Sequence, residues 1–398
     1  MTVSNKSNVG INFNVWLLVA AQALGGASPP IIISLGGLVG EQLSSDSSLS
    51  TLPVSLYQLG VALSTIPAAF IMQIMGRRVA YIVGACAGVF SGLWAAWGIL
   101  NSSFIDFCIG TSLAGFYGAC VQSYRFAAAD AVEPSIKPRA ISLIMVGGLM
   151  AAVIGPQVVI WTRNAIPDTP FAGSFFSQAA LALFALPVIM LLRMPKSTKV
   201  QFSERGRDLT QIALQPSYIV SAVASVVSFG LMSFIMTAAP MAMVSMGYGI
   251  DTAAVGIQWH VLSMFAPSFF TGRLIQRFGK VNITALGLII IASSAVAALS
   301  GTSVFHFYLS LILLGVGWNF GFVGATAMVT DCYEDSERSK TQALTDFLVF
   351  GTVAIASFSS GKLLSTLGWS AINIAMFPIV VIVLAMLWTQ RSSRLKQV

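Results

Sequence analysis

The chain has 398 residues, of which 56% are hydrophobic and only 9% are charged. Soluble domains carry about 25% charged residues, so this composition excludes a water-exposed globule and predicts a polytopic membrane protein. The net charge of +7 does not indicate nucleic-acid binding, because all Lys and Arg except Arg125, Arg163 and Lys362 fall at the termini and in alternate loops.

Apolar runs of about 20 residues predict an all-α polytopic membrane protein with twelve transmembrane helices. The first six runs lie at 13–37, 52–75, 79–100, 104–129, 140–162 and 173–194. The second six lie at 214–243, 252–275, 281–300, 304–330, 341–361 and 370–390. The expected divisions are an N-terminal half (1–194), a central loop (195–213), a C-terminal half (214–390) and a tail (391–398).

Lys and Arg gather in the loops on one side of this arrangement. The loops on the opposite side carry Glu41, Asp46, Asp168 and Asp251. The positive-inside rule therefore predicts that both termini, the central loop and the tail are cytoplasmic.

The first run contains Gly25, Gly26, Pro29 and Pro30 near its middle. Proline removes a backbone donor and clashes with the preceding turn, so we expect a kinked or locally open helix there. A packing kink and a break that lines a substrate route both fit this pattern.

An internal repeat relates the two sets of runs. The segment Gln73–Arg78 after the second run matches Gln276–Val281 after the eighth, at an offset of 203 residues. Asp130–Glu133 after the fourth run matches Asp331–Glu334 after the tenth, at an offset of 201 residues. Two duplicated six-helix halves predict an alternating-access transporter with its site between the halves.

The Gly-Arg-Arg after the second run and GRLIQRFGK after the eighth resemble the inner-loop signature of the major facilitator superfamily. Gln73 and Gln276 replace the acidic residue of that signature, so Asp130 and Glu133 are expected to form an inner latch with Arg77 and Arg78. Arg125 lies inside the fourth run, where it either snorkels to the inner surface or is a charge partner in gating. The candidate gating or coupling residues are Arg125, Asp130, Glu133, Asp331 and Glu334.

Met232 and Met236 are four residues apart in the seventh run, and His260 and Met264 repeat that spacing in the eighth. Each pair shares one helix face, and thioether and imidazole groups favour Cu(I). Methionine packing is the alternative explanation. The motifs MSFIM and HVLSM resemble those of the bacterial CcoA-like transporters, a branch that contains copper importers and riboflavin importers. That resemblance makes these four residues the candidate copper ligands.

Several runs also hold uncharged hydrogen-bonding and aromatic residues. A flat heterocycle would stack on the aromatic rings while the amides bond its edge, although such groups also join transmembrane helices to one another. The candidate substrate-binding residues are Gln22, Tyr57, Gln58, Gln122, Tyr124, Gln258, Trp259, Trp318 and Asn319.

The resemblance and the repeat together predict a bacterial inner-membrane importer of riboflavin. Copper importers of the branch that this chain resembles can carry cysteines near the outer mouth. This chain has Ser47, Ser48, Ser245 and Met246 in that region instead, which favours riboflavin over the alternative substrate, Cu(I). A ligand sensor without transport is a further alternative. No HExxH, P-loop or GxSxG motif is present, so we expect no enzymatic activity. We expect the substrate and the lipid bilayer as partners, and neither a cofactor nor nucleic acid. We expect the protein to be a monomer.

Overall fold

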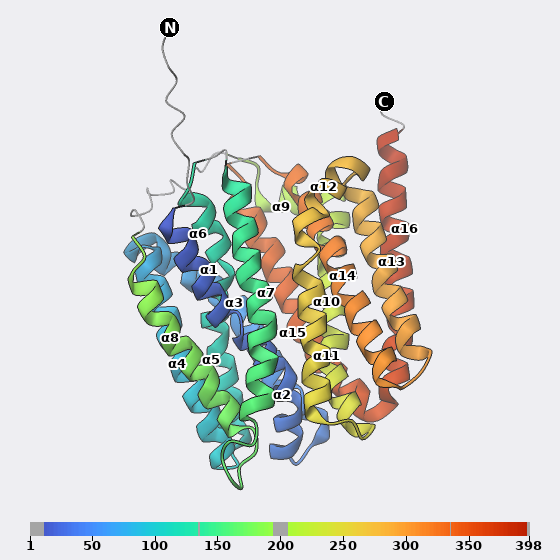
Figure 1. Ribbon diagram of the computed structural model, residues 1–398. Helices are drawn as coiled ribbons and strands as arrows, with labels where there is room; N and C mark the ends of the chain where they lie inside the picture. Colours follow the sequence, from blue (N-terminus) through green and yellow to red (C-terminus); the bar gives the residue numbers. More distant parts are fainter. Residues whose placement is uncertain (1–11, 134–135, 194–205, 335, 396–398) are drawn as a thin grey trace.

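The computed structural model describes residues 12–133, 136–193, 206–334 and 336–395. Within these ranges the chain forms helices and loops, with no strand. The long helices run roughly side by side along one direction (Figure 1). Helix α1 begins and helix α16 ends at the same end of the bundle, which we call the terminal end. The opposite end is called the far end.

The first half of the chain contributes eight helices, which form six crossings. Their bounds are α1 (Phe13–Gly25), α2 (Ser28–Leu43), α3 (Leu52–Met75), α4 (Arg77–Leu100), α5 (Phe104–Gln122), α6 (Tyr124–Asp130), α7 (Lys137–Thr162) and α8 (Ala172–Met190), with the short turn η1 (Ser47–Leu49). Two of the crossings, α1–α2 and α5–α6, are each made of two helices.

The second half repeats this plan after a short helix. Its bounds are α9 (Leu209–Ala213), α10 (Pro216–Ser245), α11 (Ile250–Phe265), α12 (Ser268–Phe278), α13 (Lys280–Leu299), α14 (Val304–Val329), α15 (Arg338–Ile374) and α16 (Met376–Leu395), with the turn η3 (Thr330–Cys332). The predicted central loop therefore contains α9, and α16 continues into the predicted tail. Residues 194–205 of that loop and 396–398 of that tail lie outside the described residues.

The prediction of an all-α membrane fold is confirmed. Ten stretches of the described residues are long and apolar enough to cross a membrane. One of them, Lys340–Gln390, is 51 residues long and includes most of α15 and α16, with a sharp turn at Gly368 inside α15. The broken helix α11–α12 is a further crossing outside these ten. The chain is a multi-pass membrane protein with the twelve expected crossings.

The predicted break in the first crossing is present, because α1 ends at Gly25 and α2 begins at Ser28 with proline in its first turn. The sequence analysis did not predict a second break, between α11 and α12 at Pro267. Asn319 of α14 stabilises it: its amide nitrogen donates to the Met264 carbonyl and to Ser268, both at 2.7 Å. The interrupted backbone is thus bonded by a neighbouring helix, as burial in a membrane requires.

The internal repeat is visible in backbone and charge. Gly76 and Gly279 join α3 to α4 and α12 to α13 with φ of 88° and 86°, a region that favours glycine. At the same terminal end, Arg77 lies 2.7 Å from Asp130 and Lys280 lies 2.5 Å from Asp331. Residues at repeat-related positions therefore make equivalent turns and equivalent ion pairs. Each ion pair lies within one half.

Candidate functional site

The two halves are joined at the far end by an ion pair. Arg163, which follows α7, bonds Asp251 in the first turn of α11 through two nitrogens, at 2.7 and 3.0 Å. The helix dipole of α11 also stabilises a carboxylate at this position. A bidentate pair fixes the relative position of the two helices better than a single contact does.

A second polar contact lies deeper along the same two helices. The amide nitrogen of Gln157 in α7 donates to the side-chain oxygen of Gln258 in α11 at 2.9 Å. Gln157 precedes Arg163 by six residues and Gln258 follows Asp251 by seven, which places the two contacts about 10 Å apart along antiparallel helices. The contacts form two rungs between the halves, which we call the far-end ladder.

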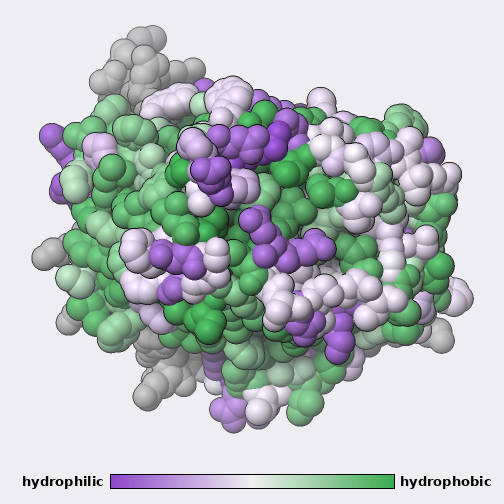
Figure 2. Space-filling view, turned by 90° about the horizontal axis from the view of Figure 1, so that it is seen from below, coloured by the Kyte–Doolittle hydropathy of each residue, from purple (hydrophilic) through white to green (hydrophobic). Residues whose placement is uncertain are grey.

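Close packing of Thr51 against α15 completes the closure of the far end. The Thr51 hydroxyl donates to the Phe358 carbonyl at 3.3 Å. A Cβ atom added to Gly361 would lie 2.3 Å from the Thr51 hydroxyl oxygen, so a glycine is required at this contact. Figure 2 views the far end, where hydrophilic residues gather in patches over the middle.

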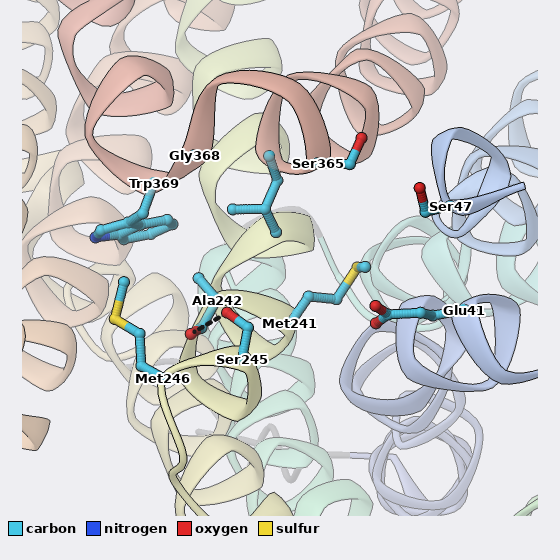
Figure 3. Close-up of a pocket in the computed structure, with 10 residues that line it drawn as sticks. Glu41, Ser47, Met241, Ala242, Ser245, Met246, Ser365, Gly368 and Trp369 are labelled. Atoms are coloured by element: carbon cyan, nitrogen blue, oxygen red, sulfur yellow. Dashed lines mark hydrogen bonds between the residues drawn. The ribbon is translucent and has the colours of Figure 1, made fainter.

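Both halves also line a pocket of about 260 Å³ at the far end. Glu41 and Ser47 come from the first half and lie across the pocket from Met246 and Trp369 of the second (Figure 3). The other residues that line it are Met241, Ala242, Ser245, Leu364, Ser365 and Gly368. The pocket thus contains Ser47, Ser245 and Met246, which the sequence analysis assigned to the outer mouth.

Four aromatic side chains meet where the second half faces the first. Phe229 packs edge-on against Trp318, Phe322 and Phe350, with ring centroids 5.3, 5.0 and 5.7 Å away. Trp318 and Phe322 stack at 5.4 Å with 14° between their planes. We call these four residues the aromatic cluster. Phe350 also belongs to a buried cluster that includes Tyr57 of the first half.

One polar atom of the aromatic cluster has no partner among the residues that the structure describes. Trp318 is 9% exposed, and its indole nitrogen is buried without a hydrogen bond to any described residue. The sequence analysis selected Trp318 but missed Phe229, Phe322 and Phe350. The spacing of Trp318 and Phe322, four residues apart on one helix face, was a signal for the second ring.

The candidate substrate residues of the first half have different environments. Tyr57 and Gln58 are buried in α3, with exposures of 3% and 6%. Tyr124 is inside the core of the first half, where its ring packs edge-on against Tyr81 at 4.7 Å. Gln22 is half-buried in α1 and Gln122 is exposed at the end of α5.

In the second half, three candidate substrate residues lie on α11 or bond it. Gln258 is part of the far-end ladder and Asn319 supports the break before α12. Trp259 is 45% exposed, whereas Val261 is buried in the core of the second half. Side chains two residues apart on a helix point about 200° apart, so Trp259 faces away from that core. Trp318 alone of these nine candidates belongs to the aromatic cluster.

The four candidate copper ligands all lie in the buried core of the second half, as members of one cluster: Met232, Met236, His260 and Met264. The Nδ1 atom of His260 is 2.8 Å from the Leu311 carbonyl. A carbonyl only accepts, so Nδ1 carries the proton and Nε2 has the lone pair. That Nε2 atom is buried and has no partner among the described residues.

The candidate gating residues lie at the terminal end. Asp130 and Asp331 form the repeat-related ion pairs with Arg77 and Lys280. Glu133 is exposed after α6. Arg125 is exposed inside the fourth crossing, and its guanidinium carbon lies 4.8 Å from the ring centroid of Phe126.

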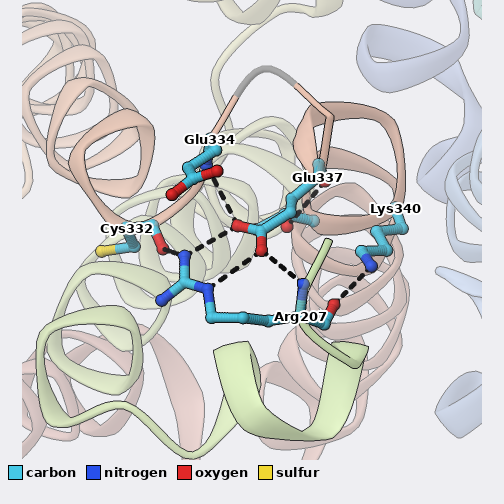
Figure 4. A network of polar contacts seen from close by, with 6 residues as sticks. Arg207, Cys332, Glu334, Glu337 and Lys340 are labelled. Atoms are coloured by element: carbon cyan, nitrogen blue, oxygen red, sulfur yellow. Dashed lines mark hydrogen bonds and ion pairs between the residues drawn. The ribbon is translucent and has the colours of Figure 1, made fainter. Parts of the chain in front are cut away.

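Glu334 belongs to a network around Glu337, which the sequence analysis did not select. Glu337 is 1% exposed, and its carboxylate accepts from the Arg207 side chain at 2.7 and 2.9 Å and from the Glu334 backbone N–H at 3.0 Å (Figure 4). The Arg207 guanidinium and this N–H lower the pKa of Glu337 to about 2. Lys340 donates to the Arg207 carbonyl. The network fixes the segment before α9 to the start of α15.

Comparisons with known proteins agree with this architecture. Residues 15–292 and 221–397 match the Major Facilitator Superfamily. The chain is 60% identical over 373 residues to riboflavin transporter RfnT of Brucella anthropi, covering 93% of this chain and 94% of that one. It is 28% identical to the uncharacterized MFS-type transporter YddS of Bacillus subtilis, covering 90% and 86% of the two chains.

The fold also resembles a solved structure. The nucleoside transporter NupG superposes with a TM-score of 0.76 at 13% identity, covering 95% of this chain and 99% of that one. The similarity of fold, the family match and the 60% identical relative lead to one assignment. The chain belongs to the Major Facilitator Superfamily.

Proposed function

We propose that this protein imports riboflavin across the bacterial inner membrane by alternating access. The observation that carries the proposal is the 60% identity to a riboflavin transporter, which extends over nearly the whole of both chains. A transporter of this family moves its substrate unchanged and is not an enzyme. Import, rather than export, is part of the proposal.

The aromatic cluster supports a flat heterocycle as the substrate. Stacked and edge-on rings offer a surface on which a planar ligand stacks, and stacking of this kind is worth about 1–3 kcal/mol per ring. The unpartnered indole nitrogen of Trp318 offers a donor for a ring carbonyl or ring nitrogen of the ligand. The cluster lies at the junction of the halves, where substrates bind in transporters built from two repeats.

The arrangement of contacts supports an inward-facing state. The far-end ladder and the Thr51 contact join the halves at the far end. The positive-inside pattern assigns the terminal end to the cytoplasm. With the far end on the outer side, the ladder would be the closed outer gate. We expect both termini to be cytoplasmic and the protein to be a monomer.

Uptake of labelled riboflavin, in a strain that neither makes nor imports it, tests the proposal. Expression of the chain should restore growth and give saturable uptake. Phe322→Leu should raise the KM about tenfold because it removes a stacking ring but keeps most of the volume. Phe320→Leu is the matched control, since Phe320 lies two residues away on the other side of α14. No growth and no uptake would refute the function.

Uptake by purified protein in proteoliposomes separates transport from sensing. A sensor would bind riboflavin without filling the vesicle, whereas a transporter accumulates it inside. Binding without accumulation would therefore favour the sensor.

Copper import is a second candidate because of His260. Its Nε2 lone pair is buried without a partner among the described residues, in the same cluster as Met232, Met236 and Met264. A His that donates Nδ1–H to a carbonyl and leaves Nε2 free has the orientation of a metal ligand. Replacing Met232 and Met236 together with Leu should abolish copper accumulation if copper is the substrate. Met243→Leu, in the same helix and cluster, is the control.

A further inference from the structure

The far end has two seams between the halves, formed by repeat-related helices. The far-end ladder joins α7 to α11, and in the second seam their repeat counterparts, α15 and α3, pack side by side. The ladder seam is held by an ion pair and an amide hydrogen bond. Within the described part of the chain, the second seam has one hydrogen bond, the 3.3 Å contact from Thr51 to the Phe358 carbonyl. The second seam therefore depends mainly on how closely its atoms fit.

That fit brings Thr51, just before α3, against Gly361 of α15. A Cβ atom added to Gly361 would lie 2.3, 2.5 and 2.9 Å from the Oγ1, Cγ2 and Cβ atoms of Thr51. All three distances are shorter than real Cβ contacts. A side chain of any size at position 361 therefore requires either Thr51 or α15 to move.

Thr51 is held on its own side of the seam. Its carbonyl accepts from the backbone N–H and the hydroxyl of Ser55, at 3.0 and 2.9 Å, which fixes it to the first turn of α3. Helix α2 packs closely against the preceding residue, because a Cβ atom added to Gly40 would lie 2.0 Å from the Ser50 carbonyl oxygen. Thr51 is itself fully buried, so the segment has little room to retreat from α15.

Helix α15 is held on the other side of the seam. The hydroxyl of Ser357, one turn before Gly361, bonds the hydroxyl of Thr237 in α10 at 3.1 Å. Both residues are buried, and a buried hydroxyl that loses its partner costs more than an exposed one. A shift of α15 within its half would disturb this contact. Separation of the halves therefore relieves an overlap at position 361 most readily.

We propose that Gly361 is the steric element of the far-end gate: the far end closes because residue 361 has no side chain, and a methyl group there shifts the protein toward the state open at this end. Thr51 and Gly361 belong to different halves, so their overlap exists in the closed state and disappears when the halves part. Overpacking of a buried contact is costly enough to shift the ratio of two states about tenfold or more. This inference rests on the alternating access of the proposed function, whatever the substrate.

Labelling of Val54→Cys with a thiol reagent measures far-end opening in the purified protein, after the exposed Cys86 is replaced by Ser. Val54 lies in the first turn of α3, is fully buried and belongs to a core cluster made mainly of second-half residues. Gly361→Ala should raise the labelling rate about tenfold or more. Gly351→Ala is the matched control, because a Cβ atom at this position of the same helix meets no atom within 4 Å. It should leave the rate unchanged.

A change in the other partner tests whether the overlap itself is responsible. Thr51→Gly removes all three atoms that a side chain at 361 would meet, so adding it to Gly361→Ala should return labelling toward the original rate. If Gly361→Ala gives no folded protein, Thr51→Leu enlarges the other side of the same contact and should raise labelling instead. Equal labelling of Gly361→Ala and Gly351→Ala would overturn the inference, as would a double variant that is labelled as fast as Gly361→Ala.

The inference and the proposed function fail in different ways, because labelling needs no riboflavin. If the wild type takes up no riboflavin but Gly361→Ala still raises labelling, the substrate is wrong and the gate stands. If riboflavin is taken up and labelling does not respond to Gly361→Ala, only the gate inference is wrong.

Discussion

The two ends of the bundle use polar side chains differently. At the far end, Arg163 and Asp251 come from different halves and hold them together. At the terminal end, Arg77 and Asp130 belong to the same half, and their repeat-related counterparts do too. Ion pairs are therefore present at both ends, but among the described pairs only Arg163–Asp251 at the far end resists separation of the halves.

This difference shows which contacts must break for the far end to open. An exposed ion pair contributes about 0–1 kcal/mol, and a neutral side-chain hydrogen bond about 1 kcal/mol. The far-end ladder thus contributes about 1–2 kcal/mol, which changes a two-state ratio about five- to thirtyfold. Such a latch favours one state and still permits exchange between the two.

The largest effect is expected when the far-end ladder is replaced by a covalent cross-link between α7 and α11. In Gln157→Cys/Gln258→Cys protein, a short bifunctional thiol reagent should join α7 to α11. Riboflavin uptake should then fall by more than about tenfold, because one of the two alternating states is removed. Uptake assays before and after the reagent measure this loss.

The single variants Gln157→Cys and Gln258→Cys, treated with the same reagent, are the controls and should keep their uptake. The exposed Cys86 is first replaced by Ser. A cross-linked double variant that still transports at the uncross-linked rate would show that the far end need not open.

A smaller effect is expected when the Arg163–Asp251 rung of the far-end ladder is weakened. Arg163→Gln removes the bidentate pair and should increase far-end opening about fivefold, in line with the loss of about 1 kcal/mol. Opening is measured by the labelling rate of Thr51→Cys with a membrane-impermeant thiol reagent, because Thr51 is fully buried in this state. Exchanging the charges, Arg163→Asp with Asp251→Arg, should return labelling toward the original rate. Equal labelling of all three proteins would contradict the latch.

The sequence predicted the architecture well because hydrophobic length and duplication are local signals. Twenty apolar residues must cross the bilayer, and the glycines at 76 and 279 had to match because both need positive φ. The break at Pro267 was less predictable. It depends on Asn319, which is 52 residues away and bonds the freed Met264 carbonyl. A sequence does not show which amide satisfies which carbonyl.

The site was predicted only in part, for a related reason. Gln258 and Trp259 are adjacent in sequence, yet one joins the halves and the other faces away from the core. One residue on a helix changes the direction of a side chain by about 100°, so a list of polar residues on eligible crossings cannot separate them. The aromatic cluster combines rings from three helices, and its composition follows from how those helices pack.

Breaking the Glu337 network is expected to reduce the stability of the fold moderately and to leave far-end opening unchanged. The folded-state pKa of Glu337 is about 2 and its ordinary value is 4.5. Because the folded value is lower, the carboxylate stabilises the fold fully above about pH 4.5, and this contribution is lost as the pH falls toward 2. Glu337→Gln should lower the melting temperature at pH 7, and the difference from the wild type should narrow below pH 4.5.

Tryptophan fluorescence of the detergent-solubilised protein, recorded during heating at several pH values, measures this difference. Glu334→Gln is the control, because Glu334 contributes its backbone N–H to the network rather than its carboxylate. A difference between Glu337→Gln and the wild type that stays constant from pH 7 to pH 3 would contradict the assigned pKa.

The smallest effect is expected when the repeat-related ion pairs at the terminal end are removed. Asp130→Asn and Asp331→Asn each remove a partly exposed pair within one half, so each should cost about 0–1 kcal/mol of stability. Since neither pair joins the halves in this state, the labelling rate of Thr51→Cys should stay unchanged. If Asp130→Asn instead increased labelling as Arg163→Gln does, breaking a pair within one half would shift the equilibrium between the halves. Asp130 would then be a gating residue, and the two ends would be coupled through α6 rather than independent.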